Sequence, residues 1–150
     1  IRPALNAVSW QEACDITYQH NGHRVSQQAF AILSKIRAVD ECVRSTDLRE
    51  RLHEIHPEVS FASWQGTPTL YAKKDVRGHE QRRALIARHF GSEAFGNVVA
   101  QIGARTVAAD DIADAFAALW SAERLLAGTA QRLPKVSVTD SYGLPMHISY

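Results

Sequence analysis

A helix with acidic residues in its first turns and small residues along one side is the feature that most constrains the fold of this chain. It is predicted from about Ala109 to Ala127, and Gly128 is a typical residue after a helix end. On such a helix Asp111 and Asp114 lie about 60° apart, so both carboxylates can point at one ligand. The same side continues with Ala115, Ala118, Ala122 and Leu125. Because small side chains allow close packing, we expect this helix to lie against a sheet and to hold a hard cation there.

A second acidic segment runs from Leu52 to Phe61. Alternation over its first six residues predicts a strand, and Pro57, which cannot donate a ladder hydrogen bond, predicts the end of that strand. Glu58 would then stand at the carboxyl end of the strand, where ligands bind in open α/β sheets. Together, Glu58, Asp111 and Asp114 predict a carboxylate site for a metal ion.

Each of these acids also has a plain structural interpretation. Carboxylates in the first turn of a helix stabilise the positive end of the helix dipole, and Asp110 can act as a cap. An exposed glutamate such as Glu58 is ordinary on a protein surface. The residues alone leave the metal site and the structural interpretation both open.

Most of the remaining predicted elements are helices. Ser9 and Glu12 form a capping-box pattern, which predicts a helix that ends near Asn21. A longer helix is predicted from Ser26 to about Arg44, with its apolar residues on one buried stripe. Those apolar residues are Ala29, Phe30, Leu33, Ile36 and Val43. Further predicted elements are a strand at 67–73, helices at 80–90 and 92–102, and a weak hairpin that joins 135–139 to 146–150.

The charge of the chain restricts its partners. Its 150 residues fit one domain, 1–150, and they include 17 basic and 16 acidic side chains, for a net charge of +1. A nucleic-acid partner would therefore need a local basic patch. The densest basic region comprises Lys73, Lys74, Arg77, Arg82 and Arg83. It is either a solvated helix face or a set of contacts to phosphate oxygens.

The two cysteines and the hydropathy of the chain predict its compartment. Cys14 and Cys42 are isolated and form no Cys-x-x-Cys motif, which argues against a disulfide framework and a thiolate zinc site. No apolar run approaches the roughly 18 residues of a membrane span. We therefore expect a cytoplasmic protein that does not bind a membrane.

Two histidines precede Glu58 and raise a zinc hypothesis. His53 and His56 would point to opposite faces of the predicted strand, whereas a zincin places its histidines one turn apart on a helix. The geometry favours His56 as a hydrogen-bonding residue beside the site over His56 as a ligand.

Several motifs resemble those of one family. Ser26-Gln27-Gln28-Ala29-Phe30-Ala31-Ile32 and Glu54-Ile55-His56-Pro57-Glu58-Val59-Ser60-Phe61 resemble a family of predicted RNase H-like nucleases of unknown physiological role. The resemblance continues at Lys35-Ile36, Val39-Asp40, Lys73-Lys74, Gly78, Asp110-Asp111 and Asp114-Ala115 to Leu119-Trp120, so it spans most of the chain. It implies an α/β, RNase H-like fold that is helix-rich, with a mixed sheet and flanking helices. It also implies metal-ligand roles for Glu58, Asp114 and Asp111. The spacing of the two aspartates is similar to that in the closing helix of Holliday-junction resolvases.

The chain departs from the family pattern at its start. The family opens with a glycine-rich strand that carries an aspartate and later has an Asp-x-Pro-x-Gly strand, and neither motif is present. Because Ile1 matches a point inside the family sequence, the resemblance implies the C-terminal part of a nuclease domain that lacks the first strands and one metal ligand. We then expect no activity from this part alone, and an open sheet edge that pairs with another copy or with the missing N-terminal segment.

The leading expectation is a Mg²⁺- or Mn²⁺-dependent nuclease. Glu58, Asp111 and Asp114 would hold the metal, while Lys73 and Lys74 contact the scissile phosphate of DNA or RNA and His56 lies beside them. The alternative is a non-catalytic module of the same fold that binds protein or nucleic acid. A phosphotransfer or ATPase variant lacks support, since the sequence contains no Gly-x-x-x-x-Gly-Lys loop.

Overall fold

The computed structural model describes residues 2–45, 47–68, 71–103, 106–136 and 138–150. These residues form two compact units, Ile1–Leu52 and His53–Tyr150, and each unit is described by itself. The expected single domain stays a prediction.

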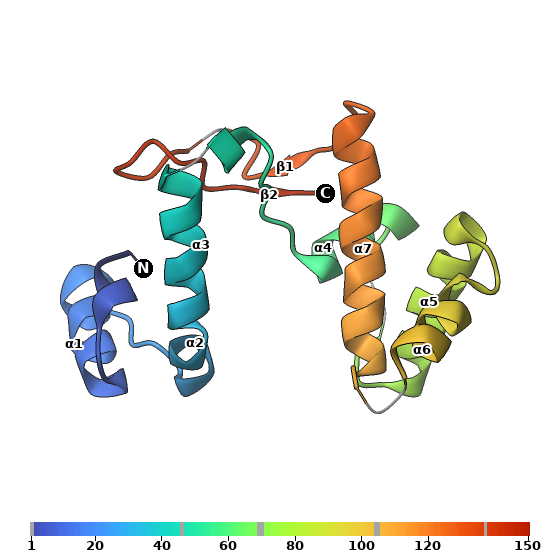
Figure 1. Cartoon of the computed structure of the whole chain (residues 1–150), viewed down its shortest axis with the longest axis horizontal. Coiled ribbons are helices and arrows are strands. Elements are labelled where there is room, and N and C mark those ends of the chain that lie inside the picture. Colours follow the sequence, from blue (N-terminus) through green and yellow to red (C-terminus); the bar gives the residue numbers. More distant parts are fainter. Residues whose placement is uncertain (1, 46, 69–70, 104–105, 137) are drawn as a thin grey trace. The chain divides into compact units, whose positions relative to one another are not determined.

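The first unit consists of short helices around a small apolar core (Figure 1). Its elements are η1 (Arg2–Asn6), α1 (Trp10–Asn21), α2 (Gln27–Ala31), α3 (Leu33–Ser45) and η2 (Asp47–Glu50). Its core contains Ala4, Leu5, Ala7, Ala13, Cys14, Val25 and Leu33. The predicted caps of α1 are confirmed: Ser9 Oγ accepts from the Glu12 N–H at 3.1 Å, and Gly22 adopts a left-handed φ of 74° after the helix.

The second predicted helix of this unit is interrupted. Ile32 stands in a turn between α2 and α3, and its N–H bonds to Ala29 O at 3.3 Å. Leu33 is buried as predicted, but Ile36 is 42% exposed, so the apolar stripe is not buried along its length. The prediction of one continuous helix with one buried stripe is therefore wrong.

Four helices form most of the second unit. They are α4 (Pro57–Gln65), α5 (Val76–Phe90), α6 (Ala94–Ile102) and α7 (Ala109–Leu126), and α7 contacts each of the other three (Figure 1). Their buried core comprises Phe61, Leu85, Ile86, Phe95, Ile112, Ala113, Phe116 and Ala117. At its edge the Trp64 ring stacks on Phe61 and Trp120, with centroids 5.8 and 5.3 Å apart. These aromatic contacts bring α4 and α7 together.

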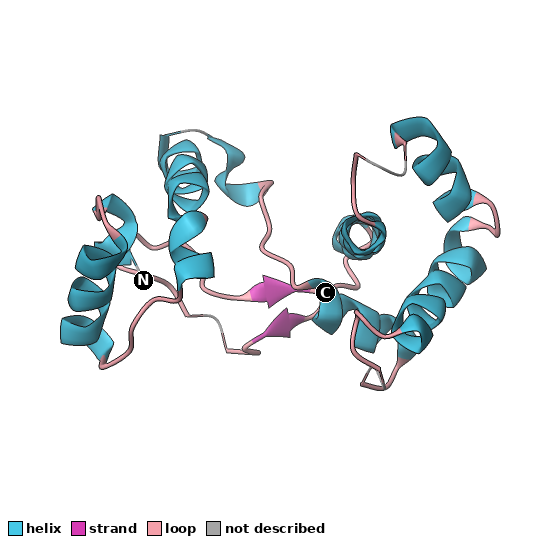
Figure 2. Cartoon of the chain, turned by 90° about the horizontal axis from the view of Figure 1, so that it is seen from below, coloured by secondary structure: helices cyan, strands magenta, loops and turns pink. Residues whose placement is uncertain are grey.

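The sheet is minimal in the described part of the chain. Two-residue strands β1 (Arg132–Leu133) and β2 (Ile148–Ser149) pair in antiparallel fashion, and Thr139 forms an isolated bridge with Pro145 (Figure 2). The antiparallel return agrees with the predicted hairpin, although its first strand lies earlier than 135–139. Helices dominate and no mixed sheet is present among these residues. The predicted α/β, RNase H-like fold with a mixed sheet and flanking helices is therefore wrong.

The proline of the acidic segment explains part of this difference. Residues 52–56 have no regular structure, and Pro57 is the first residue of α4, where its fixed φ and missing N–H suit a helix start. The segment makes one hydrogen bond to a strand, from Ser149 N–H to Glu54 O at 2.7 Å. The predicted strand at 67–73 lies partly outside the described residues, and Lys73 stands in a turn.

The helix α7 begins and ends close to its prediction but packs through another face. Its buried residues are Ile112, Ala113, Phe116, Ala117, Trp120 and Ser121. Ala115 and Ala122, on the side expected to face a sheet, are exposed. Ser121 donates or accepts a buried hydrogen bond with Ser60 of α4 at 2.8 Å, so the close packing of α7 is against helices. No helix in the described ranges combines the length and apolar character that crossing a bilayer requires.

At Gly78, in the first turns of α5, the packing leaves no room for a Cβ atom. A Cβ at Gly78 would overlap the carbonyl oxygen of Ala72 and lie 3.0 Å from Arg82 Nη1. Gly96 in α6 has nothing within 4 Å of its Cβ position. The preceding loop and α5 therefore approach each other only because residue 78 lacks a side chain.

This contrast predicts opposite effects for two equal substitutions. Gly78→Ala should destabilise the protein by about 1–3 kcal/mol, because the backbone must move to relieve the overlap. Gly96→Ala should stabilise it by up to about 1 kcal/mol through helix propensity. Urea unfolding measures both free energies. Equal effects of the two substitutions would contradict the close approach at Ala72.

Candidate functional site

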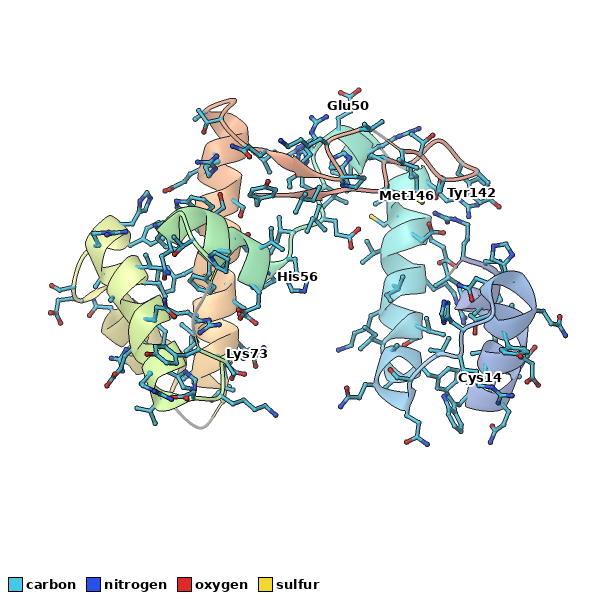
Figure 3. The ribbon with its side chains drawn as sticks, turned by 180° about the vertical axis from the view of Figure 1, so that it is seen from behind. Cys14, Glu50, His56, Lys73, Tyr142 and Met146 are labelled. Atoms are coloured by element: carbon cyan, nitrogen blue, oxygen red, sulfur yellow. The ribbon has the colours of Figure 1, made fainter. Side chains whose placement is uncertain are left out.

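The candidate site lies where the loop between α4 and α5 meets the start of α7. Lys73 of this loop places its Nζ 3.3 Å from Asp114 Oδ2 and 3.8 Å from Asp110 Oδ2 (Figure 3). The two aspartates are four positions apart on α7, so they share one face of the helix. Two carboxylates from successive turns therefore hold one ammonium group.

The electrostatics of Lys73 fix its charge. The carboxylate of Asp114 raises the pKa of Lys73 above its usual value of 10.5, first by charge attraction and then through a hydrogen bond. Asp110 and Glu58 raise this pKa further, whereas partial desolvation opposes the increase. Lys73 is thus a cation at neutral pH, which makes it unsuited to act as a base or nucleophile.

Glu58 approaches the same region from α4. It follows Pro57 in the first turn of that helix, where the dipole favours a negative charge. One carboxylate oxygen, Oε2, accepts a hydrogen bond from Arg82 Nη2 at 2.6 Å. The charge of Glu58 also makes the smallest of the contributions that raise the pKa of Lys73.

Arg82 links Glu58 to the loop that carries Lys73. Its side chain is only 3% exposed, and its Nη1 donates to Gly78 O at 2.8 Å and to Tyr71 O at 3.4 Å. These bonds connect the loop that carries Lys73 to α5 and to the Glu58 carboxylate. The guanidinium also lies 5.5 Å from the centre of the Phe61 ring, at the edge of the core.

The structure brings some of the predicted site residues together and separates others. Lys73 pairs with Asp114, and Glu58 pairs with Arg82. Asp111 is exposed. Among the described residues, Lys73 forms its ion pairs with Asp110 and Asp114. Lys74 is exposed in the same loop. His56 is exposed immediately before α4, and Figure 3 shows it on the side of that helix away from α7.

Sequence reasoning missed two members of the cluster. Asp110 was interpreted as a cap, although its four-residue spacing from Asp114 matches a helix face better than the three-residue spacing of Asp111. Arg82 was grouped with exposed basic residues. Its position four residues after Gly78 was the available signal, since residues at that spacing are neighbours on a helix.

The cluster fits a hard divalent cation in the chemistry of its donors. Carboxylate oxygens are the ligands that Mg²⁺ and Mn²⁺ prefer, and two of these carboxylates already hold a cation, the Lys73 ammonium. As they stand, however, no three His, Cys, Asp or Glu side chains of the described ranges lie close enough together to hold an ion. In this arrangement these residues therefore do not form a metal site.

The buried position of Arg82 predicts a stability effect. Arg82→Met should destabilise the protein by about 1–3 kcal/mol, because Glu58 and two backbone carbonyls lose a donor. The control is Arg83→Met, which removes an exposed guanidinium 4.9 Å from the Phe95 ring and should cost about 1 kcal/mol or less. Both are measured by urea unfolding, and equal losses would contradict the role of Arg82.

The raised pKa of Lys73 predicts a pH dependence. Because this pKa is higher in the folded than in the unfolded protein, its contribution to stability is complete below pH 10.5 and is lost as pH rises through the folded-state value. The stability difference between wild type and Lys73→Met should therefore persist from pH 7 to 10 and begin to decrease above pH 10.5. Denaturation over pH 7–11.5 tests this, with the exposed Lys74→Met as control. A Lys73→Met difference that stays constant to the end of that range would refute it.

A comparison with known families completes the description of the site. A family model described as Protein of unknown function (DUF429) matches residues 1–139. It agrees with the expected resemblance at the level of a domain of unknown function. No curated protein and no solved structure gives a significant match.

Proposed function

The chain belongs to the family described as Protein of unknown function (DUF429), and we propose that it provides the acidic site of a metal-dependent nuclease. The reaction proposed is hydrolysis of phosphodiester bonds in nucleic acid. The resemblance of its motifs to those of predicted RNase H-like nucleases supports this proposal from the sequence.

The pairing of Lys73 with two carboxylates of α7 is the observation that carries the proposal. Asp110 and Asp114 share one face of the helix, and Lys73 comes from a loop that is remote in the sequence. The charge of Glu58 makes the smallest contribution to the raised pKa of Lys73. Carboxylate oxygens that already attract one cation are the type of ligand that Mg²⁺ and Mn²⁺ prefer.

In this proposal Glu58, Asp110 and Asp114 hold Mg²⁺ or Mn²⁺, with Asp110 in the place first predicted for Asp111. An ion held by these residues would supply activation of water and stabilisation of the leaving oxygen of the phosphodiester. Arg82 keeps Glu58 and the loop in position. The exposed Lys74 is the candidate for contact with a phosphate of the nucleic acid.

A non-catalytic binding module is the second candidate, and one observation favours it. Glu58, Asp110 and Asp114 all have a cationic partner, either Arg82 or Lys73. Such pairs can serve the fold alone, with the acids of the first turns stabilising the helix dipoles. In that case the region binds no metal, and a nucleic-acid or protein partner would contact the exposed basic residues.

Paired measurements of metal binding and cleavage separate the two candidates. Mn²⁺ affinity of this chain and nuclease activity of the full-length protein on single- and double-stranded DNA and RNA would be measured for wild type, Glu58→Gln and Asp114→Asn. Both substitutions should weaken Mn²⁺ binding at least about tenfold and reduce cleavage, since each removes a charged ligand. Asp111→Asn is the matched control and should change neither.

Two results would contradict the proposed metal site. Cleavage that survives in both Glu58→Gln and Asp114→Asn would exclude these carboxylates as catalytic groups. Binding that falls in Asp111→Asn and not in Asp114→Asn would move the site to the exposed side of α7. Thermal unfolding of each variant distinguishes loss of a ligand from loss of the fold.

A further inference from the structure

We infer that Asn21 is a site of spontaneous deamidation, a modification that converts its side-chain amide to a carboxylate and gives an isoaspartyl link to Gly22 as one product. Asn21 is the last residue of α1 and Gly22 is the cap of that helix, and both residues are exposed. The site lies in the first unit, so the inference does not depend on the proposed function.

The side chain of Asn21 is held across the peptide nitrogen that would attack it. Asn21 Oδ1 accepts a hydrogen bond from the His23 N–H at 3.0 Å, so the amide group folds forward along the chain over Gly22. A donor at this oxygen also stabilises the negative charge that develops there when Cγ is attacked. The amide is therefore placed and polarised for reaction with the next residue.

Gly22 leaves its own nitrogen accessible. The residue has no side chain, and within the described ranges no atom beyond its chain neighbours lies within 4 Å of the position that a Cβ would take. A larger residue would place a Cβ beside the attacking nitrogen. The combination of a folded-over amide and an unhindered nitrogen is what the reaction requires.

The reaction needs only water. The Gly22 nitrogen attacks Asn21 Cγ, the new N–Cγ bond closes a cyclic succinimide, and the side-chain nitrogen leaves as ammonia with the proton of the peptide nitrogen. Water then opens the ring at one of its two carbonyl carbons. Opening at Cγ gives aspartate, whereas opening at the main-chain carbonyl gives isoaspartate, in which the chain runs through Cβ and Cγ. Overall, one water is consumed and one ammonia is released.

One hydrogen bond controls access to this reaction. The Gly22 N–H donates to Tyr18 O at 2.9 Å, and this bond must open before the nitrogen can attack. The last turn of a helix opens more readily than its middle. Deamidation should therefore proceed from the frayed end of α1.

The products disturb the end of α1. A carboxylate at a helix C-terminus is repelled by the negative end of the helix dipole, and the isoaspartyl link adds a carbon atom to the main chain. The chain continues to Val25, which is 4% exposed and whose carbonyl accepts from Trp10 Nε1 at 2.8 Å. A change at Asn21 should therefore reach the contact between Val25 and Trp10.

Peptide mass spectrometry on the wild-type chain tests the inference without a variant that must fold. The protein would be incubated at mildly alkaline pH and digested, and each asparagine would be followed by its mass gain of about 1 Da. Asn21 should react at least about tenfold faster than Asn6 and Asn97, since neither of these precedes a glycine. Equal rates at the three asparagines, or an unmodified Asn21, would overturn the inference.

The indole N–H resonances test the effect on the first unit. In ¹⁵N-labelled protein the Trp10 signal should move as deamidation proceeds, whereas the signals of Trp64 and Trp120, in the second unit, should stay in place. Asn21→Asp carries the charge without the isoaspartyl link and should move the Trp10 signal less. A Trp10 signal that is unchanged in fully deamidated protein would contradict the inferred effect on the contact with Val25.

Discussion

The packing of α4 against α7 is the contact on which the candidate site depends. Stacked rings of Trp64 and Trp120 and a buried hydrogen bond between Ser60 and Ser121 hold the two helices side by side. Glu58 lies two residues before Ser60, so this contact fixes where its carboxylate stands relative to α7. The aromatic contacts contribute attraction, and the hydroxyl pair favours this register because the buried Ser60 Oγ bonds to Ser121 Oγ across the two helices. The packing of α4 against α7, and not the acids themselves, therefore sets the position of Glu58 relative to α7.

The fold could be predicted only where the signal is local. Caps such as Ser9, and Gly128 after α7, act within one turn of the chain, which is why the predicted helix ends largely agree with the structure. The predicted strand that ended at Pro57 was wrong because proline also starts helices, and alternation over six residues does not decide between the two. The buried face of α7 could not be assigned either, since alanines lie on several of its sides and tertiary contacts select among them.

The site was predictable in part for the same reason. Glu58 and Asp114 stood out because carboxylates of two separate segments can share one ligand, although each also has a plain structural interpretation. The ion pair of Asp114 with Lys73 joins residues 41 positions apart, which no local pattern contains. Arg82 was hidden because an arginine in a basic run is normally solvated, and only the packing of α5 reveals that it is buried. The structure therefore adds Asp110 and Arg82 to a site for which the sequence predicted Glu58, Asp114 and Lys73.

The coupling between Lys73 and Asp114 tests the central claim most directly, because it reports whether the loop and α7 meet at one charge pair. It is obtained from the unfolding free energies of Lys73→Met, Asp114→Asn and the double variant. For this partly exposed pair the predicted coupling is favourable and about 0.5 kcal/mol, whereas the same cycle with Lys74 in place of Lys73 should give none. A coupling of zero for Lys73 and Asp114, or an equal coupling for Lys74, would contradict the convergence of these elements.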